Sequence, residues 1–413
     1  MKFLEAFETQ KTRPKLIPNF KQTERRLLSV FLALLSISAT VRSRFLKSCG
    51  YNSGLTCKYN AAMEVTFKGS QMPEVRPDGL IHCQKGQTNW SAFIEAKSEG
   101  NLIRSDQITS YLELAKLTGC DNVITISNEY ARVPSEPPYH VDPKKSRSIG
   151  VHHFAWAEIR TTLELLRADV DLPEVERAVL EECLEYFWDE KSGIQTYNLM
   201  PEVWPAFVEA SSTALGFNTN IRGLADVVYG WQQERRDLSS KLTRLWGRPV
   251  ELRHKAGVRS SDEERSKVDR QDLASDYTMS AHYYFKDARS GLEVLLDLRA
   301  CRMSAALDIP VPDGKGAKAC VTWLERTLSD TPSTDSSVCF DWPGRGGDIH
   351  MSTEKFSEEP EIAYQGQKNP PKSMKLVVSR HGVRDFKSRK KIILNVEQMV
   401  LDLAGYGIQV GWL

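Results

Sequence analysis

The chain has 413 residues, of which 41% are hydrophobic and 26% are charged, and its formal net charge is +1. This length and composition predict a globular protein of two or three domains. Because positive and negative charges nearly balance, nucleic-acid binding cannot be inferred from the overall charge. Any electropositive surface must therefore be local. The eight cysteines form no CxxC pair, which supports neither a zinc site nor a disulfide framework and favours reduced thiols in the cytoplasm.

The first apolar stretch runs over Leu27–Val41 and superficially resembles a membrane segment. It is too short to span a bilayer comfortably, it contains several hydroxyl side chains, and its long polar lead disfavours a signal peptide. We therefore expect no association with a membrane. The stretch instead predicts a buried helix that is capped by Thr23 and has Glu24 in its first turn.

Three stretches after this helix have the composition of strands. The first, Ala62–Lys68, carries Glu64, which either joins a metal site or is solvated. The second and third, Arg76–Ile81 and Trp90–Lys97, are apolar runs with a polar segment at Gln84–Asn89 between them. Glycine and asparagine in such a segment predict a β-hairpin.

This hairpin predicts a cluster of charged side chains. Because side chains alternate along a strand, Glu95 and Lys97 point to the same face. Ile94 and Ala96 then face the opposite side, where a layer of helices can bury them. Asp78, at the start of the neighbouring strand, comes to lie beside Glu95. Two carboxylates at such close range repel each other, and a divalent cation that prefers oxygen ligands, Mg²⁺ or Mn²⁺, relieves the repulsion. With a lysine to orient water and offset developing charge, this set is suited to the hydrolysis of phosphodiesters.

The elements that follow predict an α/β domain. A helix is expected over Asp106–Thr118 and an apolar strand over Asn122–Ser127. Alternating apolar residues predict a fifth strand within Arg147–Trp156, and a closing helix follows over Trp156–Leu166. The resulting order, α-β-β-β-α-β-β-α, places residues 1–168 in one domain.

Three motifs of this domain resemble, in their order, those of a nuclease superfamily. Pro77-Asp78 at one strand and Glu95-Ala96-Lys97 at the end of the next resemble the PD-(D/E)XK signature. The stretch Gln107–Tyr111 on the following helix resembles the QxxxY motif of the RecB and lambda-exonuclease branch. The ExK triplet alone is common, whereas the full order is much more specific. The resemblance covers only the N-terminal part of the chain and implies a restriction-endonuclease-like core, in which helices flank a mixed sheet.

The resemblance also implies roles for the side chains in these motifs. Asp78 and Glu95 would bind Mg²⁺ or Mn²⁺, and Lys97 would position or activate the attacking water. Gln107 and Tyr111 lie one helical turn apart on the same face. They would support the lysine or contact the nucleic-acid backbone.

Two further acidic residues are candidates for the metal site. Several branches of this class place an additional acidic ligand on the first helix, which makes Glu24 a candidate. Glu64 is a candidate from the first predicted strand. The alternative for Glu24 is an acid favoured by the helix dipole, and the alternative for Glu64 is a solvated side chain.

The rest of the chain predicts two further regions. Residues 169–272 are mainly helical, with apolar residues at helical spacing in Glu174–Phe187 and Leu224–Leu245, and they end in a highly charged linker or exposed helix. Residues 273–413 predict an α+β accessory module of unknown role. Its expected elements are strands at Ser280–Phe285, Leu292–Leu298, Ser337–Asp341, His350–Ser352 and Met374–Ser379 and helices at Ala317–Leu328 and Arg389–Leu403.

Together these features predict a cytoplasmic deoxyribonuclease that depends on Mg²⁺ or Mn²⁺. Defence against foreign DNA, such as phage DNA, and DNA repair are the roles that the resemblance implies. Two alternatives are open: a non-catalytic nucleic-acid-binding or regulatory protein on the same scaffold, and a nuclease directed at RNA. Homo-oligomerisation and an activating ligand or protein partner are open as well.

Overall fold

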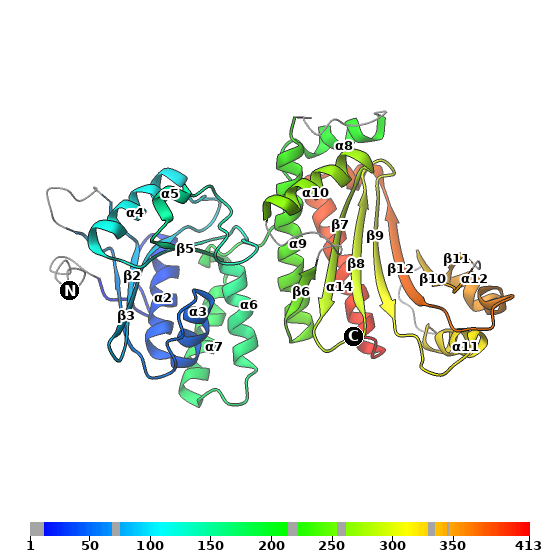
Figure 1. Cartoon of the computed structure of the whole chain (residues 1–413), viewed down its shortest axis with the longest axis horizontal. Coiled ribbons are helices and arrows are strands. Elements are labelled where there is room, and N and C mark those ends of the chain that lie inside the picture. Colours follow the sequence, from blue (N-terminus) through cyan, green and yellow to red (C-terminus); the bar gives the residue numbers. More distant parts are fainter. Residues whose placement is uncertain (1–11, 68–74, 214–221, 254–261, 329–334, 345–346) are drawn as a thin grey trace. The chain divides into compact units, whose positions relative to one another are not determined.

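The computed structural model describes residues 12–67, 75–213, 222–253, 262–328, 335–344 and 347–413. The chain divides into two compact units, residues 1–197 and residues 198–413 (Figure 1). Each unit has its own sheet, with five strands in the first and seven in the second.

The first unit is built on a mixed sheet with the strand order β1-β2-β3-β4-β5. The strands β1, β2 and β3 pair antiparallel, whereas β4 runs parallel to both β3 and β5. The predicted mixed sheet of an α/β fold is therefore confirmed. The strands are Lys58–Met63 (β1), Gly79–Lys85 (β2), Thr88–Ala96 (β3), Asn122–Ser127 (β4) and Gly150–Ala155 (β5).

Helices flank this sheet on both faces (Figure 1). The helices α2, α3, α6 and α7 form a layer on one side, and α4 lies on the other side with the short α5 next to it. The helices are Thr23–Ile37 (α2), Ala39–Ser48 (α3), Ser105–Thr118 (α4), Pro143–Ser146 (α5), Trp156–Arg167 (α6) and Glu174–Trp188 (α7), with a 3₁₀ turn at Glu190–Ser192.

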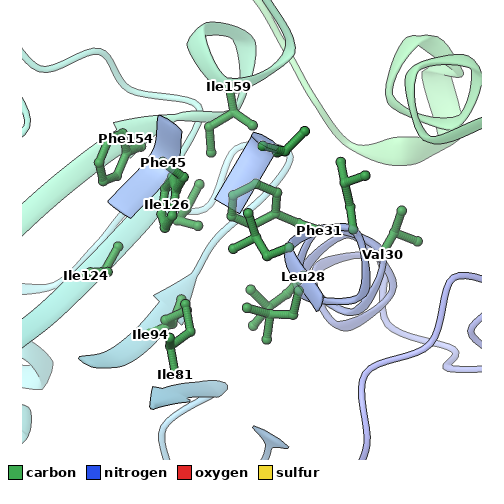
Figure 2. Packing of buried hydrophobic residues seen from close by; sticks show 14 of the residues in the cluster. Leu28, Val30, Phe31, Phe45, Ile81, Ile94, Ile124, Ile126, Phe154 and Ile159 are labelled. Atoms are coloured by element: carbon green, nitrogen blue, oxygen red, sulfur yellow. The ribbon is translucent and has the colours of Figure 1, made fainter. Parts of the chain in front are cut away.

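Side chains alternate along β3, so that they pack into two separate hydrophobic clusters on opposite faces of the sheet. Ile94 lies in the same buried cluster as Leu28 of α2 (Figure 2). Ala96 belongs to this cluster as well. Phe93 belongs instead to the cluster beneath α4. Because residues two apart on a strand share a face, Glu95 points to the α4 side of the sheet, as Phe93 does.

The single first helix predicted over Leu27–Val41 is a pair of helices, α2 and α3, bent by 111°. The break lies at Ser38, whose hydroxyl accepts a hydrogen bond from the Val41 N–H and so caps α3. The same hydroxyl donates to Glu176 Oε2 at 2.5 Å. No single helix of the described residues is long and apolar enough to cross a membrane, although this bent pair would be if both helices are taken together.

The first strand lies earlier in the chain than the sequence predicts. The predicted range is Ala62–Lys68, whereas β1 ends at Met63, opposite Gly79 of β2. At Glu64 the backbone enters the left-handed region, with a φ of 53°, and leaves the ladder. The predicted bounds are therefore wrong, and Lys68 itself lies outside the described residues.

The second unit is built on an antiparallel sheet with the order β11-β10-β12-β9-β8-β7-β6. Burial alternates along β7, β8 and β9, so one face is packed and the other is partly exposed. The strands are Val250–Arg253 (β6), Thr278–Phe285 (β7), Gly291–Asp297 (β8), Arg302–Ile309 (β9), Ser336–Asp341 (β10), Asp348–Ser352 (β11) and Ser373–His381 (β12).

Two long helices, α9 and α14, pack against each other and against the buried face of this sheet (Figure 1). Gly407 of α14 lies so close to β9 that a Cβ there would meet Leu307 Cδ2 at 2.7 Å, which explains a glycine inside a long helix. The helices are Trp204–Thr213 (α8), Leu224–Trp246 (α9), Asp262–Ser275 (α10), Ala317–Thr327 (α11), Thr353–Glu358 (α12), Val383–Lys387 (α13) and Arg389–Gln409 (α14), with a 3₁₀ turn at Pro360–Tyr364.

The two units divide the chain differently from the predicted domain boundaries at residues 168 and 272. Leu180 and Phe187 of α7, from the predicted helical middle region, belong to the hydrophobic core of the first unit. By contrast, α9 packs on β6 and β7, two strands of the sheet in the second unit. The middle region is therefore shared between the two units and forms no body of its own.

Candidate active site

The β2–β3 hairpin brings two carboxyl groups together at one end of the first sheet. Gly79 of β2 pairs with Ile94 of β3. Their neighbours Asp78 and Glu95 lie close enough for a direct interaction between the two carboxyls. Asp78 Oδ2 also accepts a hydrogen bond from the Ala96 N–H at 3.0 Å, which holds this side chain against the end of β3. Glu95 is almost completely buried, with 1% of its side chain exposed.

Three side chains surround the Glu95 carboxylate. Lys97 Nζ lies 2.5 Å from Glu95 Oε1 and forms an ion pair with it. Gln107 Nε2 donates to the same oxygen at 2.6 Å, and the Tyr111 hydroxyl donates to Oε2 at 2.5 Å. Gln107 and Tyr111 lie one turn apart on α4, on the side of the sheet to which Glu95 points. The structure thus brings together, with Asp78, the five side chains that the sequence predicts for the catalytic site.

The main chain fixes the position of Lys97 after the end of β3. Its N–H donates to the carbonyl of Ile126 in β4 at 2.8 Å. Its carbonyl accepts a hydrogen bond of 2.8 Å from the indole Nε1 of Trp156, a fully buried residue at the start of α6. Both backbone groups of Lys97 are therefore engaged, which holds its Cα in place while its side chain reaches Glu95.

Burial and the neighbouring Glu95 carboxyl change the proton affinity of Asp78. Burial, and then the repulsion by Glu95, raise the pKa of Asp78 from its ordinary value of 3.8 to about 7. The Ala96 N–H and the Lys97 ammonium oppose this rise without cancelling it. Near neutral pH Asp78 therefore retains part of its proton unless a further positive charge lies near it.

The same carboxylates keep Lys97 in its cationic form. Burial disfavours the ammonium, but the carboxylates around it, Glu95 first among them, outweigh burial and raise the pKa of Lys97 above 10.5. At neutral pH the side chain is therefore an ammonium. It offers a positive charge and N–H donors, and it does not act as a base.

The donor set of Asp78 and Glu95 suits an oxygen-preferring divalent cation. Both residues offer only oxygen ligands, which Mg²⁺ and Mn²⁺ prefer. Burial and the repulsion by Glu95 raise the pKa of Asp78. A cation bound by both carboxylates would offset this repulsion and would displace the proton. Asp78 and Glu95 are therefore the residues that would hold the ion.

Glu24 lies at the edge of this arrangement. Its Oε1 accepts hydrogen bonds from Asn101 Nδ2 at 2.8 Å and from the Ser98 N–H at 3.3 Å. Its charge contributes to the raised pKa of Lys97, so the two side chains are near each other. Glu24 thus anchors the loop that follows β3, and its role as a metal ligand stays a prediction.

Glu64 is held by two arginines. Its carboxylate forms ion pairs with Arg25 of α2 and, at 3.0 Å, with Arg76 before β2. Its backbone N–H donates to the Asp78 carbonyl at 3.1 Å, so its main chain is close to the site. The Glu64 side chain is thus directed to the guanidinium groups and not to the carboxyl pair. Neither arginine belongs to one of the motifs, so the motifs did not predict that these residues lie near the site.

A second acidic group lies in the second unit and was not predicted. Among the described residues, one group of three metal-ligating side chains has its ligand atoms within 4.8 Å of one another: Glu234, Asp237 and Glu397. Glu397 is far from the other two in the sequence, so no spacing pattern could have revealed the group.

The partly exposed face of the second sheet contains a cavity of about 310 Å³. Among its lining residues, Cys339 Sγ lies 2.8 Å from His350 Nδ1. Burial raises the pKa of Cys339 to about 11, although Lys375 opposes the rise. The thiol is therefore protonated at neutral pH and is not an activated nucleophile.

Removing the Tyr111 hydroxyl is expected to destabilise the end of β3 by about 1.5–3 kcal/mol, because the buried Glu95 carboxylate then loses one of its hydrogen-bond donors. The Tyr111 side chain is only 2% exposed, and the substitution Tyr111→Phe leaves the packing of its ring intact. Hydrogen exchange of peptides from β3 and α4 measures the loss. Tyr51→Phe is the matched control, because the Tyr51 hydroxyl has no hydrogen-bond partner among the described residues. Equal losses in both variants would contradict the role assigned to Tyr111.

The end of β3 therefore combines a carboxyl pair that can bind a divalent cation, an ammonium in contact with one of these carboxyls, and two donors from α4 that hold it. Such a set can bind and polarise a phosphate. No family model, curated protein or solved structure matches the chain.

Proposed function

We propose that the first unit is a nuclease that hydrolyses phosphodiester bonds in DNA with Mg²⁺ or Mn²⁺. One observation carries the proposal: the Asp78–Glu95 carboxyl pair has the Lys97 ammonium 2.5 Å from Glu95 Oε1. The strand order, with α4 between β3 and β4, also supports a restriction-endonuclease-like core, the fold that the PD-(D/E)XK motifs imply.

Each side chain has a distinct part in this proposal. Asp78 and Glu95 would hold the ion by their oxygens. When bound, the ion would supply positive charge that polarises a phosphate and makes water more acidic. Gln107 and Tyr111 keep the Glu95 carboxylate in one orientation through hydrogen bonds of 2.6 and 2.5 Å. A fixed carboxylate needs little reorganisation during the reaction, which favours the transition state.

Lys97 supplies charge. Its raised pKa keeps it an ammonium at neutral pH, so it donates hydrogen bonds to the attacking water or to a phosphate oxygen. As negative charge grows on the phosphate in the transition state, a cation fixed nearby stabilises it more than it stabilises the substrate. Lys97 therefore positions the water and does not remove a proton from it.

The choice of DNA and of a role in defence or repair rests on the resemblance of the motifs. The carboxyl pair and the lysine act on a phosphate that DNA and RNA share, so the geometry itself suits either polymer. Two arginines, Arg25 and Arg76, lie next to the site on Glu64. Their guanidinium groups offer N–H donors to phosphates of a bound strand.

The test is cleavage of linear and circular DNA, single-stranded and double-stranded, with RNA in parallel. Each substrate is incubated with Mg²⁺, with Mn²⁺ and with EDTA. The full-length protein is compared with the double variant Asp78→Asn/Glu95→Gln, which keeps the shape of both side chains and removes both charges. We expect cleavage of DNA that requires the metal and is absent from the double variant.

Two results would overturn the proposal. Cleavage by the double variant equal to that of the wild type would place the activity elsewhere or in a contaminant. No cleavage of any substrate, together with metal-independent binding of DNA, would favour a binding protein on the same scaffold. Cleavage of RNA alone would keep the site and correct the substrate, and comparison of linear with circular DNA separates exonuclease from endonuclease action.

A further inference from the structure

An acidic group lies where α9 and α14 pack against each other in the second unit. Glu234 and Asp237 are on α9, and Glu397 is on α14. One carboxylate oxygen of each lies within 4.8 Å of the other two. Oxygen-preferring divalent cations hold their ligands at about 2.0–2.6 Å, so two ligands of one ion are about 5 Å apart at most. The three oxygens are therefore close enough to share one ion.

Glu234 itself points to a ligand at this place. Its side chain is fully buried, and neither of its carboxylate oxygens has a hydrogen-bond partner among the described residues. The nearby Tyr283 hydroxyl donates instead to the Arg235 carbonyl, at 3.0 Å. A carboxylate buried in this way is strongly unfavourable unless it is paired, protonated or bound to a metal.

The charges of the group do not balance within the protein. Lys241 Nζ lies 2.7 Å from Asp237 Oδ2 and 2.5 Å from Glu397 Oε1. The positive charge of Arg244 also acts on Glu397. Three carboxylates therefore face two cations, so negative charge is in excess and a bound cation would reduce that excess. Both oxygens of Glu234 lie outside these ion pairs.

We propose that Glu234, Asp237 and Glu397 bind one oxygen-preferring divalent cation, such as Mn²⁺, Mg²⁺ or Ca²⁺, and that this ion links α9 to α14. The donors are oxygens only, without the nitrogen or sulfur ligands that zinc sites prefer. Because both helices cover the buried face of the second sheet, an ion between them stabilises the layer on which that sheet packs. The site lies in the second unit and does not depend on the nuclease proposal.

A proton competes with the ion for Glu234. Burial, and then the charges of Glu397 and Asp237, raise the pKa of Glu234 well above its ordinary value. The two occupants differ in what they require. A proton on Glu234 needs no metal in solution, whereas the ion makes the stability of α9 and α14 depend on metal concentration.

The experiment is hydrogen exchange of the full-length chain, freed of metal and then titrated with Mn²⁺. It is carried out on the Asp78→Asn/Glu95→Gln background, so that ligands of the first unit do not contribute. Peptides from α9 and α14 should exchange about 100-fold more slowly at an ion concentration of 100 times Kd, because binding lowers the population of open states by that factor. Equilibrium dialysis with metal analysis should find one ion for each chain.

Two variants then assign the effect to the site. Glu234→Gln keeps the size of the side chain. It should abolish both the binding of the ion in equilibrium dialysis and the Mn²⁺-dependent protection of α9 and α14 from hydrogen exchange. Asp402→Asn removes an exposed charge from the same helix as Glu397 and should leave both intact. Protection that persists in Glu234→Gln would overturn the proposal. So would exchange in α9 and α14 that does not respond to Mn²⁺, Mg²⁺ or Ca²⁺ at millimolar concentration, a result that would assign a proton to Glu234.

Discussion

Replacing Lys97 by methionine is expected to lower kcat for DNA cleavage by about 10²–10⁴-fold, the range typical of losing one group that stabilises charge or positions a proton in a transition state. Methionine keeps most of the aliphatic length and removes the ammonium that lies 2.5 Å from Glu95 Oε1. Substrate affinity depends on many phosphate contacts, so KM should change much less. Initial rates over a range of DNA concentrations at saturating Mg²⁺ separate the two constants.

The control for this experiment is Lys116→Met. Lys116 is an exposed residue in the last turn of α4, so the variant loses the same charge from the same unit and should retain the kcat of the wild type. Removing one partner of a buried ion pair costs about 3–5 kcal/mol. The Lys97 variant must therefore also be shown to be folded, by circular dichroism and thermal unfolding with Mg²⁺ present. A folded Lys97→Met protein that cleaves DNA at the rate of the wild type would exclude the role assigned to Lys97.

The arrangement of the candidate site could be predicted because local geometry fixes most of it. Glu95 and Lys97 share a face since they are two residues apart on extended backbone. Asp78 reaches Glu95 through a hairpin whose turn residues are visible in the sequence. Gln107 and Tyr111 share a face since they are one helical turn apart. None of these relations depends on a contact with a remote part of the chain.

Parts of the fold were missed because tertiary contacts or weak local preferences decide them. The break between α2 and α3 depends on Ser38, which caps α3 and reaches Glu176 far along the chain. Apolar periodicity alone does not reveal such a break. The strand β9 was missed because Ala305 and Ala306 at its centre have low strand propensity. Its buried residues nevertheless alternate along the whole strand, so a count of period-two matches would have found it.

The division into units and the second acidic group could not be predicted because they depend on contacts between segments that are distant in the sequence. Leu180 of α7 packs in the first unit, although the helix follows the last strand of that sheet by many residues. Glu234 and Glu397 meet only because α9 and α14 cover the same sheet. A carboxylate on either helix looks, in the sequence, like one more charge on a solvated face.

Replacing Asp78 by asparagine is expected to stabilise the metal-free protein at pH 8. Asparagine keeps an oxygen that can accept the Ala96 N–H, now bound at 3.0 Å, but it has no charge beside Glu95. Burial and then Glu95 raise the pKa of Asp78 from 3.8 to about 7, so the native state holds a proton that the unfolded chain has released. Linkage then makes the stability of the wild type fall as pH rises from about 4 to about 7, by about 4 kcal/mol in total.

The asparagine variant does not lose stability in this way as pH rises. The difference in the free energy of unfolding between the variant and the wild type should therefore be small at pH 4, increase up to about pH 7 and stay constant above it. Urea unfolding of metal-free protein, with pulsed hydrogen exchange in β3 and α4, measures the difference, and Asp171→Asn at an exposed position is the control. Mg²⁺ at 100 times Kd should stabilise the wild type by about 2.7 kcal/mol and the variant much less. The difference in stability between the two proteins should therefore become smaller. A variant no more stable than the wild type at pH 8 would mean that neither burial nor Glu95 disfavours the ionised Asp78 carboxylate. The pair would then have no physical need for a cation, and the metal-dependent mechanism would fail with it.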